Sequence, residues 1–162
     1  SDVSRSSFYV HYQDKYDLID HIEQEMFDGF RLRMRQVRRE GLEYFRIANE
    51  EMLTGQLERA YFEYIAQEPR WWTLFMTGRG KSDFVQRFTH VIYDEFAGTA
   101  DEWKEREAED HSIPLPLGLA MNAWSYVGVI SFWIETGMKR SPEDMGRSLA
   151  VYWHRFKRRV SK

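Results

Sequence analysis

VSRSSFYVHYQDKYDL, at residues 3–18, predicts a short helix, a tight break and the start of a long helix. Ser4 can cap the short helix, because its hydroxyl can accept a hydrogen bond from the free amides of the first turn. Asp14 can cap the long helix in the same way, with Asp17 three residues later as in a capping box. Lys15 lies in the first turn of that helix, where the helix dipole disfavours a cation. We therefore expect Lys15 to meet an anion, and a phosphate backbone is such an anion.

The same run carries a family resemblance. SRSSFYVHYQDKYDL resembles the recognition helix and following linker of TetR-family transcriptional repressors, whose pattern is roughly S-R-x-T-[FL]-Y-x-H-F-x-[DN]-K-x-x-L. Two positions depart mildly from it, with Ser7 for the usual Thr and Tyr12 for the usual Phe. The DNA-binding unit of that family is a helix-turn-helix of three helices, and residues 4–12 match its third helix only. A generic helical hairpin with a chance aromatic cluster is the alternative interpretation.

The resemblance implies a partner and a mode of action. The partner is double-stranded operator DNA, bound by a cytoplasmic homodimer that responds to an unidentified small-molecule effector and acts as a repressor. The resemblance implies that Arg5 contacts base edges. It also implies contacts to phosphate or sugar from Ser7, Tyr9, His11 and Lys15. The alternative function is a helical dimer that senses small molecules or serves as an adaptor without binding DNA.

Composition bounds the class of protein. The chain has 162 residues, of which 16% are aromatic, so it can bury a sizeable core and is ordinarily one folded unit. It contains no cysteine, which excludes disulfides and thiolate metal sites and suits a reducing cytoplasm. Its net charge of -3 supplies no global basic field that would attract nucleic acid. Any DNA contact must therefore come from a local group of residues.

Nearly every segment has the apolar spacing of a helix, and no strand-like alternation or internal repeat is present. We therefore predict an all-α fold. The expected helices lie at 14–40 with Gly41 as the stop, from Leu53 to the Glu68–Pro69 step, from Pro69 to Gly78, from Ser82 to Phe96, at 117–137, and from the cap Ser141 to Val160. The resemblance makes this a TetR-like helical domain, in which residues 1–40 are the remnant of the DNA-binding region and residues 41–162 bind ligand and dimerise.

The predicted helix at 117–137 is apolar on all sides. One group of apolar residues consists of Leu117, Met121, Trp124, Val127, Ile130 and Ile134. A second group covers much of the rest and consists of Leu119, Ala123, Tyr126, Val129, Phe132 and Trp133. Such a helix must be buried all round, and a second copy of the chain can provide the missing cover. We predict that this helix and the next form a four-helix bundle in a homodimer, with a central helix of one domain as the alternative.

The uncharged stretch at 112–134 has the length of a membrane-spanning helix. Pro114 and Pro116 shorten its helical part, however, and polar residues such as Asn122 dilute its apolar character. We therefore expect no membrane as a partner.

In the TetR family the last two helices form the dimer bundle, and the junction at 137–145 resembles the usual connection between them.

The middle of the chain resembles the ligand domain of one branch of the family, which includes regulators resembling an activator of dihydroxyacetone kinase genes. The stretches that carry this resemblance are YIAQEP at 64–69, the aromatic residues after it, and GKSDF at 80–84. The GKS letters also resemble the end of a phosphate-binding P-loop. That loop needs a glycine where Phe75 stands and a strand before it, so we expect no P-loop here.

Side chains suited to catalysis or metal binding form no useful pattern. The histidines lack the spacing of metal ligands. No nucleophile elbow, cysteine nucleophile or carboxylate pair in an apolar frame is present. We therefore predict that the protein is not an enzyme and that it uses no cofactor and no metal.

Aromatic residues and methionines from several predicted helices can meet and line a pocket for a small apolar ligand. The resemblance implies an effector site in this region. The candidate ligand-binding residues are Tyr61, Trp72, Phe75, Met76, Phe84, Phe88, Met121 and Trp124. A polar contact can come from Asn122, Tyr61, Tyr64 or Tyr126. For each aromatic residue, a plain core position is the alternative interpretation.

Overall fold

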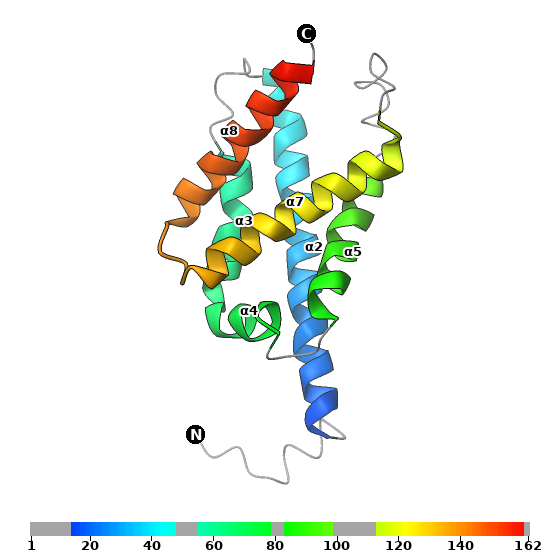
Figure 1. The fold of residues 1–162 in the computed structure, drawn as a ribbon, viewed down its shortest axis with the longest axis vertical. Coiled ribbons are helices and arrows are strands. Elements are labelled where there is room, and N and C mark those ends of the chain that lie inside the picture. The colour runs from blue at the N-terminus through cyan, green and yellow to red at the C-terminus, as the bar shows by residue number, and fades with distance from the viewer. Residues whose placement is uncertain (1–13, 48–54, 79–82, 99–112, 161–162) are drawn as a thin grey trace.

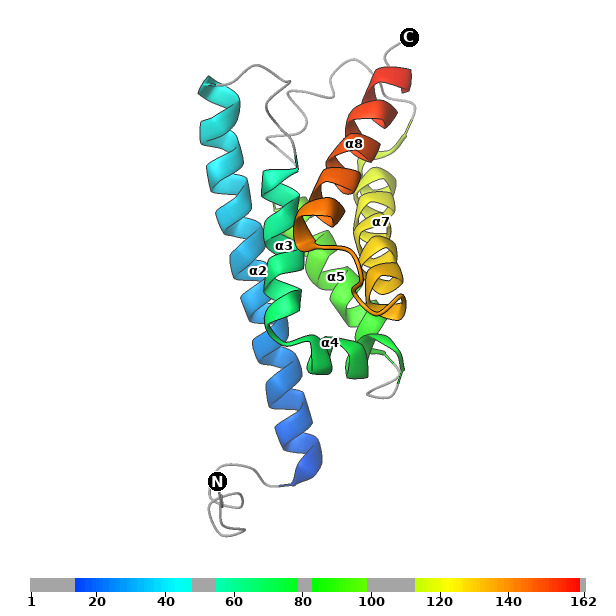
Figure 2. The same ribbon diagram turned by 90° about the vertical axis from the view of Figure 1, so that its left-hand side faces the viewer.

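The computed structural model describes residues 14–47, 55–78, 83–98 and 113–160 of the chain. These residues form six helices and no strand, which confirms the predicted all-α fold. The helices are α2 (Lys15–Ile47), α3 (Gln56–Gln67), α4 (Pro69–Met76), α5 (Phe84–Ala97), α7 (Leu115–Glu135) and α8 (Pro142–Val160). In Figures 1 and 2, α2, α3, α5 and α8 run roughly lengthwise, α7 crosses them obliquely, and α4 lies across one end.

α2 begins as the sequence predicts. Asp14 accepts hydrogen bonds from the backbone N–H groups of Tyr16 at 2.7 Å and Asp17 at 2.9 Å, so it is the N-cap. The expected stop at Gly41 is wrong, because the helix continues to Ile47. A single glycine inside a long helix costs only about 1 kcal/mol, which the turns on either side can offset. The expected domain boundary therefore falls inside one helix.

Most of α2 packs against the bundle, but its first turns extend past α4 at one end (Figure 2). Farther along, α2 buries a stripe at helical spacing against α3 and α5. The stripe consists of Met26, Phe27, Phe30, Met34 and Val37. Gly29 lets α3 approach, because a side chain there would collide with the hydroxyl of Tyr64. That hydroxyl donates a hydrogen bond to the carbonyl of Met26 at 3.1 Å.

α3 and α4 meet at the predicted Glu68–Pro69 step. Pro69 takes the first position of α4, where its missing N–H would be unpaired in any case. Gly78 follows the end of α4 with a φ of 75°. The residues that α4 buries are Trp72, Phe75 and Met76. The expected start of α3 at Leu53 and the expected cap Ser82 lie outside the described residues.

α8 also begins as predicted, with Pro142 at its first position. The hydroxyl of Ser141 accepts a hydrogen bond from the backbone N–H of Asp144 at 3.1 Å, as an N-cap does. In the preceding turn, the indole N–H of Trp133 donates to the carbonyl of Arg140 at 2.9 Å. This hydrogen bond ties the end of α7 to the turn, and α8 then packs along α3.

α3 and α8 cross with almost no space between their backbones. Gly55, with a φ of 75°, immediately precedes α3, and Gly146 lies in the second turn of α8. A Cβ atom on Gly146 would lie 2.5 Å from the backbone nitrogen of Arg59 and 2.5 Å from the carbonyl oxygen of Gly55. Because neither backbone atom can move without separating the helices, this crossing requires glycine.

Candidate functional site

The predicted DNA-binding residues belong to the N-terminal end of the chain. Those that lie outside the described residues are Arg5, Ser7, Tyr9 and His11. Lys15 is the first residue of α2, and it is exposed, with its ammonium 5.0 Å from the centre of the Tyr16 ring. It therefore lies on the turns of α2 that project from the bundle (Figure 1), where a phosphate backbone can reach it.

Six of the eight predicted ligand-binding residues lie together in the core. We call them the aromatic core, and they are Tyr61, Trp72, Phe75, Met76, Phe84 and Phe88, each at most 7% exposed. Rings of α4 and α5 within it are stacked or edge-to-face, at 4.9 Å between centroids for Phe75 and Phe84 and 5.1 Å for Trp72 and Phe88. Such pairs are favourable beyond the area that they bury, so they hold α4 and α5 firmly together.

The other two predicted residues, Met121 and Trp124, lie apart from this core. They are 48% and 53% exposed on the outer side of α7. The sequence pattern grouped them with Val127 and Ile130, but those two residues face the core and are 2% and 1% exposed. That grouping is wrong, because a helix that is apolar on all sides offers no polar face from which its orientation can be inferred.

One edge of the aromatic core carries polar groups. Here the ring of Tyr61 lies 5.8 Å from that of Tyr126 on α7, and the ring of Phe96 on α5 lies 5.5 Å from that of Tyr126. Glu58 precedes Tyr61 by one turn of α3, and Arg38 of α2 lies near them. We call these five residues the polar edge. It brings α2, α3, α5 and α7 to one place.

Burial and charge perturb two groups at the polar edge. Burial raises the pKa of the Glu58 carboxyl above its usual range. Burial also raises the pKa of the Tyr61 hydroxyl, as does the negative charge of Glu58, while the positive charge of Arg38 opposes the rise. These three groups therefore interact electrostatically, and perturbed groups of this kind mark candidate binding sites.

The sequence indicated only part of the polar edge. Tyr61 and Tyr126 were expected as polar contacts, whereas Arg38 and Glu58 were missed, because charges on amphipathic helices resemble a solvated face. Of the remaining expected contacts, Tyr64 already donates its hydroxyl hydrogen to a backbone carbonyl of α2. Arg38 and Glu58 are recognised as neighbours only when the packing of α2 against α3 is known.

Glu58→Gln is expected to raise the thermal midpoint of unfolding near neutral pH. The folded protein favours the neutral carboxyl, so the stability due to protonation is present below the ordinary pKa of 4.5 and is lost as pH rises through the higher folded-state pKa. The advantage of the variant should therefore shrink as the solution becomes acidic. Melting curves followed by circular dichroism from acid to neutral pH measure this, with Glu40→Gln, at an exposed position of α2, as the control. An advantage independent of pH would contradict it.

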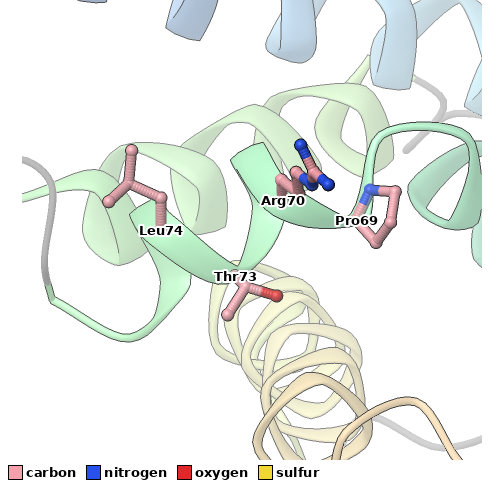
Figure 3. Close-up of a pocket in the computed structure, with 4 residues that line it drawn as sticks. All are labelled: Pro69, Arg70, Thr73 and Leu74. Carbon is pink, nitrogen blue, oxygen red and sulfur yellow. The ribbon is translucent and has the colours of Figure 1, made fainter.

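A separate hollow of about 360 Å³ opens on the outer side of α4. Its lining residues are Pro69, Arg70, Thr73 and Leu74. All four come from one helix, as Figure 3 shows, and none belongs to the aromatic core. Small-molecule sites usually enclose their ligand between several elements, so this open hollow is a poor candidate for the effector site.

The outer face of α7 is strongly apolar. Its exposed residues are Leu117, Met121, Trp124 and Phe132, which are 53%, 48%, 53% and 62% exposed. α8 adds Val151 and Tyr152, which are 44% and 53% exposed. Contiguous apolar surface on a folded domain marks an interaction site. Gly128 is also exposed on α7 and has open space where a side chain would stand, so another helix can approach closely there.

By length and composition alone, α7 is also able to cross a membrane. Its inner side, however, is packed in the protein core. The residues buried there are Leu119, Ala123, Val127, Ile130, Trp133 and Ile134. A core helix of a soluble protein meets the same criteria of length and hydropathy, so α7 by itself is weak evidence for a membrane span.

Comparison with known families identifies a related family. A TetR-type family described as "Transcriptional regulator C-terminal region" matches residues 56–154. The matched region begins with α3 and ends within α8, so it includes the aromatic core and the apolar face of α7. No curated protein and no solved structure gives a significant match.

Proposed function

The chain belongs to the TetR family of transcriptional regulators, and we propose that it is the ligand-sensing and dimerising part of a homodimeric repressor of operator DNA. The match over residues 56–154 carries this proposal, and the family is non-enzymatic. The run at 3–18, which resembles the recognition helix of the family, supports the DNA-binding role. Effector binding would shift the balance between two dimer states that differ in the spacing of their recognition helices, and hence in DNA affinity.

The effector is proposed to bind at the polar edge. Tyr61, Tyr126 and Phe96 offer aromatic faces, while Glu58 and Arg38 offer charges of opposite sign. Small-molecule sites combine an apolar wall with a few polar groups that orient the ligand, and this edge has both. In this proposal the other residues of the aromatic core support the wall. Met121 and Trp124 then belong to the dimer contact and not to the ligand site.

The dimer contact is proposed to be the outer face of α7 packed on the same face of a second copy, with α8 completing a four-helix bundle. The support is the set of large apolar side chains that one chain leaves exposed on these two helices. A two-fold axis would let each exposed side chain meet the same surface of the partner. Gly128 would let the two α7 helices approach at the centre of the contact.

Two finer assignments have weaker support. The stretches at 64–69 and 80–84 support a place in the branch of regulators resembling an activator of dihydroxyacetone kinase genes. The family, together with the absence of cysteine from the sequence, supports a cytoplasmic location. Neither assignment is needed for the proposed mechanism.

Lys15→Ala, made in the protein expressed from its complete gene, is expected to weaken binding to all DNA sequences by a similar factor. Lys15 is exposed on the projecting end of α2, where we propose a phosphate contact. Losing one phosphate contact should reduce the slope of log affinity against log salt by about 1. Gel shifts over a range of salt concentrations measure the slope. Lys139→Ala, an exposed lysine in the turn before α8, is the control, and equal slopes for both variants would contradict the role.

The function as a whole is tested by capturing fragmented genomic DNA with the complete protein and sequencing what is retained. Native mass spectrometry of the same preparation gives the oligomer and the mass of any bound small molecule. A dimer that enriches a two-fold symmetric site is the expected result. A dimer that enriches no site would instead support the alternative, a helical small-molecule sensor or adaptor that does not bind DNA.

A further inference from the structure

Two ion pairs join α2 to α5. In the first, the carboxylate of Glu23 on α2 is fully buried and forms an ion pair with the guanidinium of Arg87 on α5. In the second, the guanidinium of Arg35 on α2 donates hydrogen bonds to the carboxylate of Glu95 on α5. Nη2 of Arg35 lies 2.6 Å from Oε1 of Glu95, and Nε lies 3.0 Å from both carboxylate oxygens. Glu95 is itself only 9% exposed. Both carboxylates are thus withdrawn from water and held by arginines of the facing helix.

The order of the charges makes the pairing specific for one alignment. Acid precedes base along α2, base precedes acid along α5, and the two helices run in the same direction (Figure 1). Sliding α2 by one turn, about 5.4 Å, would bring Glu23 level with Asp83 or Val91 of α5 in place of Arg87. Beside Asp83, the Glu23 carboxylate would face a second acid. Beside Val91, it would be buried against an apolar side chain, so both alignments are unfavourable.

α2 and α5 also pack through aromatic rings, which do not provide such specificity. Phe27 of α2 lies 5.0 Å from Phe84 and 6.0 Å from Phe88, and Phe30 lies 4.8 Å from Phe88. Apolar burial is non-directional, so rings of similar size can pack in more than one alignment. Charges buried beside them are the groups that distinguish one alignment from the next.

The first ion pair lies where α2 leaves the bundle. Glu23 is the first fully buried residue of α2, and the residues before it are exposed or partly buried. Arg87 also lies over the ring of Phe27, with its guanidinium carbon 5.5 Å from the centroid, so its position is defined from two sides. The turns of α2 that project from the bundle therefore start at this pair.

We propose that the Glu23–Arg87 and Arg35–Glu95 ion pairs set the alignment of α2 on α5 and act as positioning residues for the projecting end of α2. The consequence for operator DNA rests on the proposed function, in which that end carries the recognition helix. The polar edge contacts the second ion pair, because Arg38 donates a hydrogen bond to the backbone carbonyl of Glu95 at 3.5 Å. An effector that displaces Arg38 would act directly beside the second ion pair.

The test compares Arg87→Gln with the double variant Glu23→Gln/Arg87→Gln by hydrogen exchange and thermal melting of the ligand-free protein. Arg87→Gln leaves a buried carboxylate without the arginine of α5, so it should lower the melting midpoint and speed exchange in residues 15–30 by about tenfold. The double variant has no buried charge at this pair and should regain the melting midpoint. It should nevertheless keep the faster exchange in residues 15–30, because the remaining Arg35–Glu95 pair does not fix the alignment where α2 leaves the bundle.

The matched control is Arg147→Gln, which removes an exposed ion pair with Glu143 within α8 and should change neither measurement. Recovery of wild-type exchange in the double variant would overturn the proposal, since the pair would then affect stability alone. Wild-type exchange of α2 in folded Arg87→Gln, or an equal acceleration in every helix, would also overturn it. If Arg87→Gln does not fold, the double variant still decides the outcome. Failure of the wild-type protein to bind DNA would refute the proposed function without changing this comparison.

Discussion

Phe132→Glu is expected to convert the proposed homodimer into a folded monomer. Phe132 is 62% exposed in one chain and lies on the outer face of α7 with Leu117, Met121 and Trp124. Truncating a central aromatic residue of an interface commonly costs about 2–4 kcal/mol of binding free energy. A carboxylate in its place must also be desolvated, so the dissociation constant should rise about a thousandfold or more.

Sedimentation equilibrium over a range of protein concentrations measures this change, and circular dichroism confirms that the monomer is folded. Folding should be retained because the Phe132 side chain is already largely in solvent in the single chain. Leu32→Glu is the matched control, since Leu32 is a similarly exposed apolar residue, at 56%, on α2 and away from α7. A Phe132→Glu protein that dimerises as tightly as wild type would refute the proposed interface.

Gly146→Ala is expected to destabilise the fold by about 2 kcal/mol, in the range usual for overpacking. The added Cβ atom would lie 2.5 Å from the backbone nitrogen of Arg59 and from the carbonyl oxygen of Gly55. Since real Cβ atoms do not approach so closely, α3 and α8 would have to separate. These two helices share the most extensive helix–helix contact among the described elements, so the separation affects the whole domain.

Urea unfolding measures the free energy of unfolding of this variant. Gly118→Ala is the control, because its Cβ would meet only one side-chain atom, of Ile113, at 3.8 Å. Alanine is a better helix former than glycine by up to about 1 kcal/mol, so the control should be neutral or slightly stabilised. A Gly146→Ala protein as stable as Gly118→Ala would show that α3 and α8 accommodate a methyl group at their crossing.

The start signals of the helices could be predicted from the sequence because they depend on neighbouring residues only. Asp14 and Ser141 cap α2 and α8 as expected, and Pro69 opens α4. Gly41 was misjudged as a stop because a glycine inside a helix is only a small local cost, and α2 continues to Ile47. Six of the candidate ligand-binding residues are buried together, as apolar residues at helical spacing are expected to be, and their role in ligand binding stays a prediction.

The sequence alone determined the helical class, the caps and the need of α7 for cover on every side. The tertiary structure decided which side of α7 faces its own core and which side, with Trp124 and Phe132, stays exposed. It also brought Arg87 to Glu23, and Gly146 to Gly55, across long separations in the chain. Periodicity and capping describe one helix at a time, whereas these contacts exist only where two helices meet, and no local pattern encodes where that is.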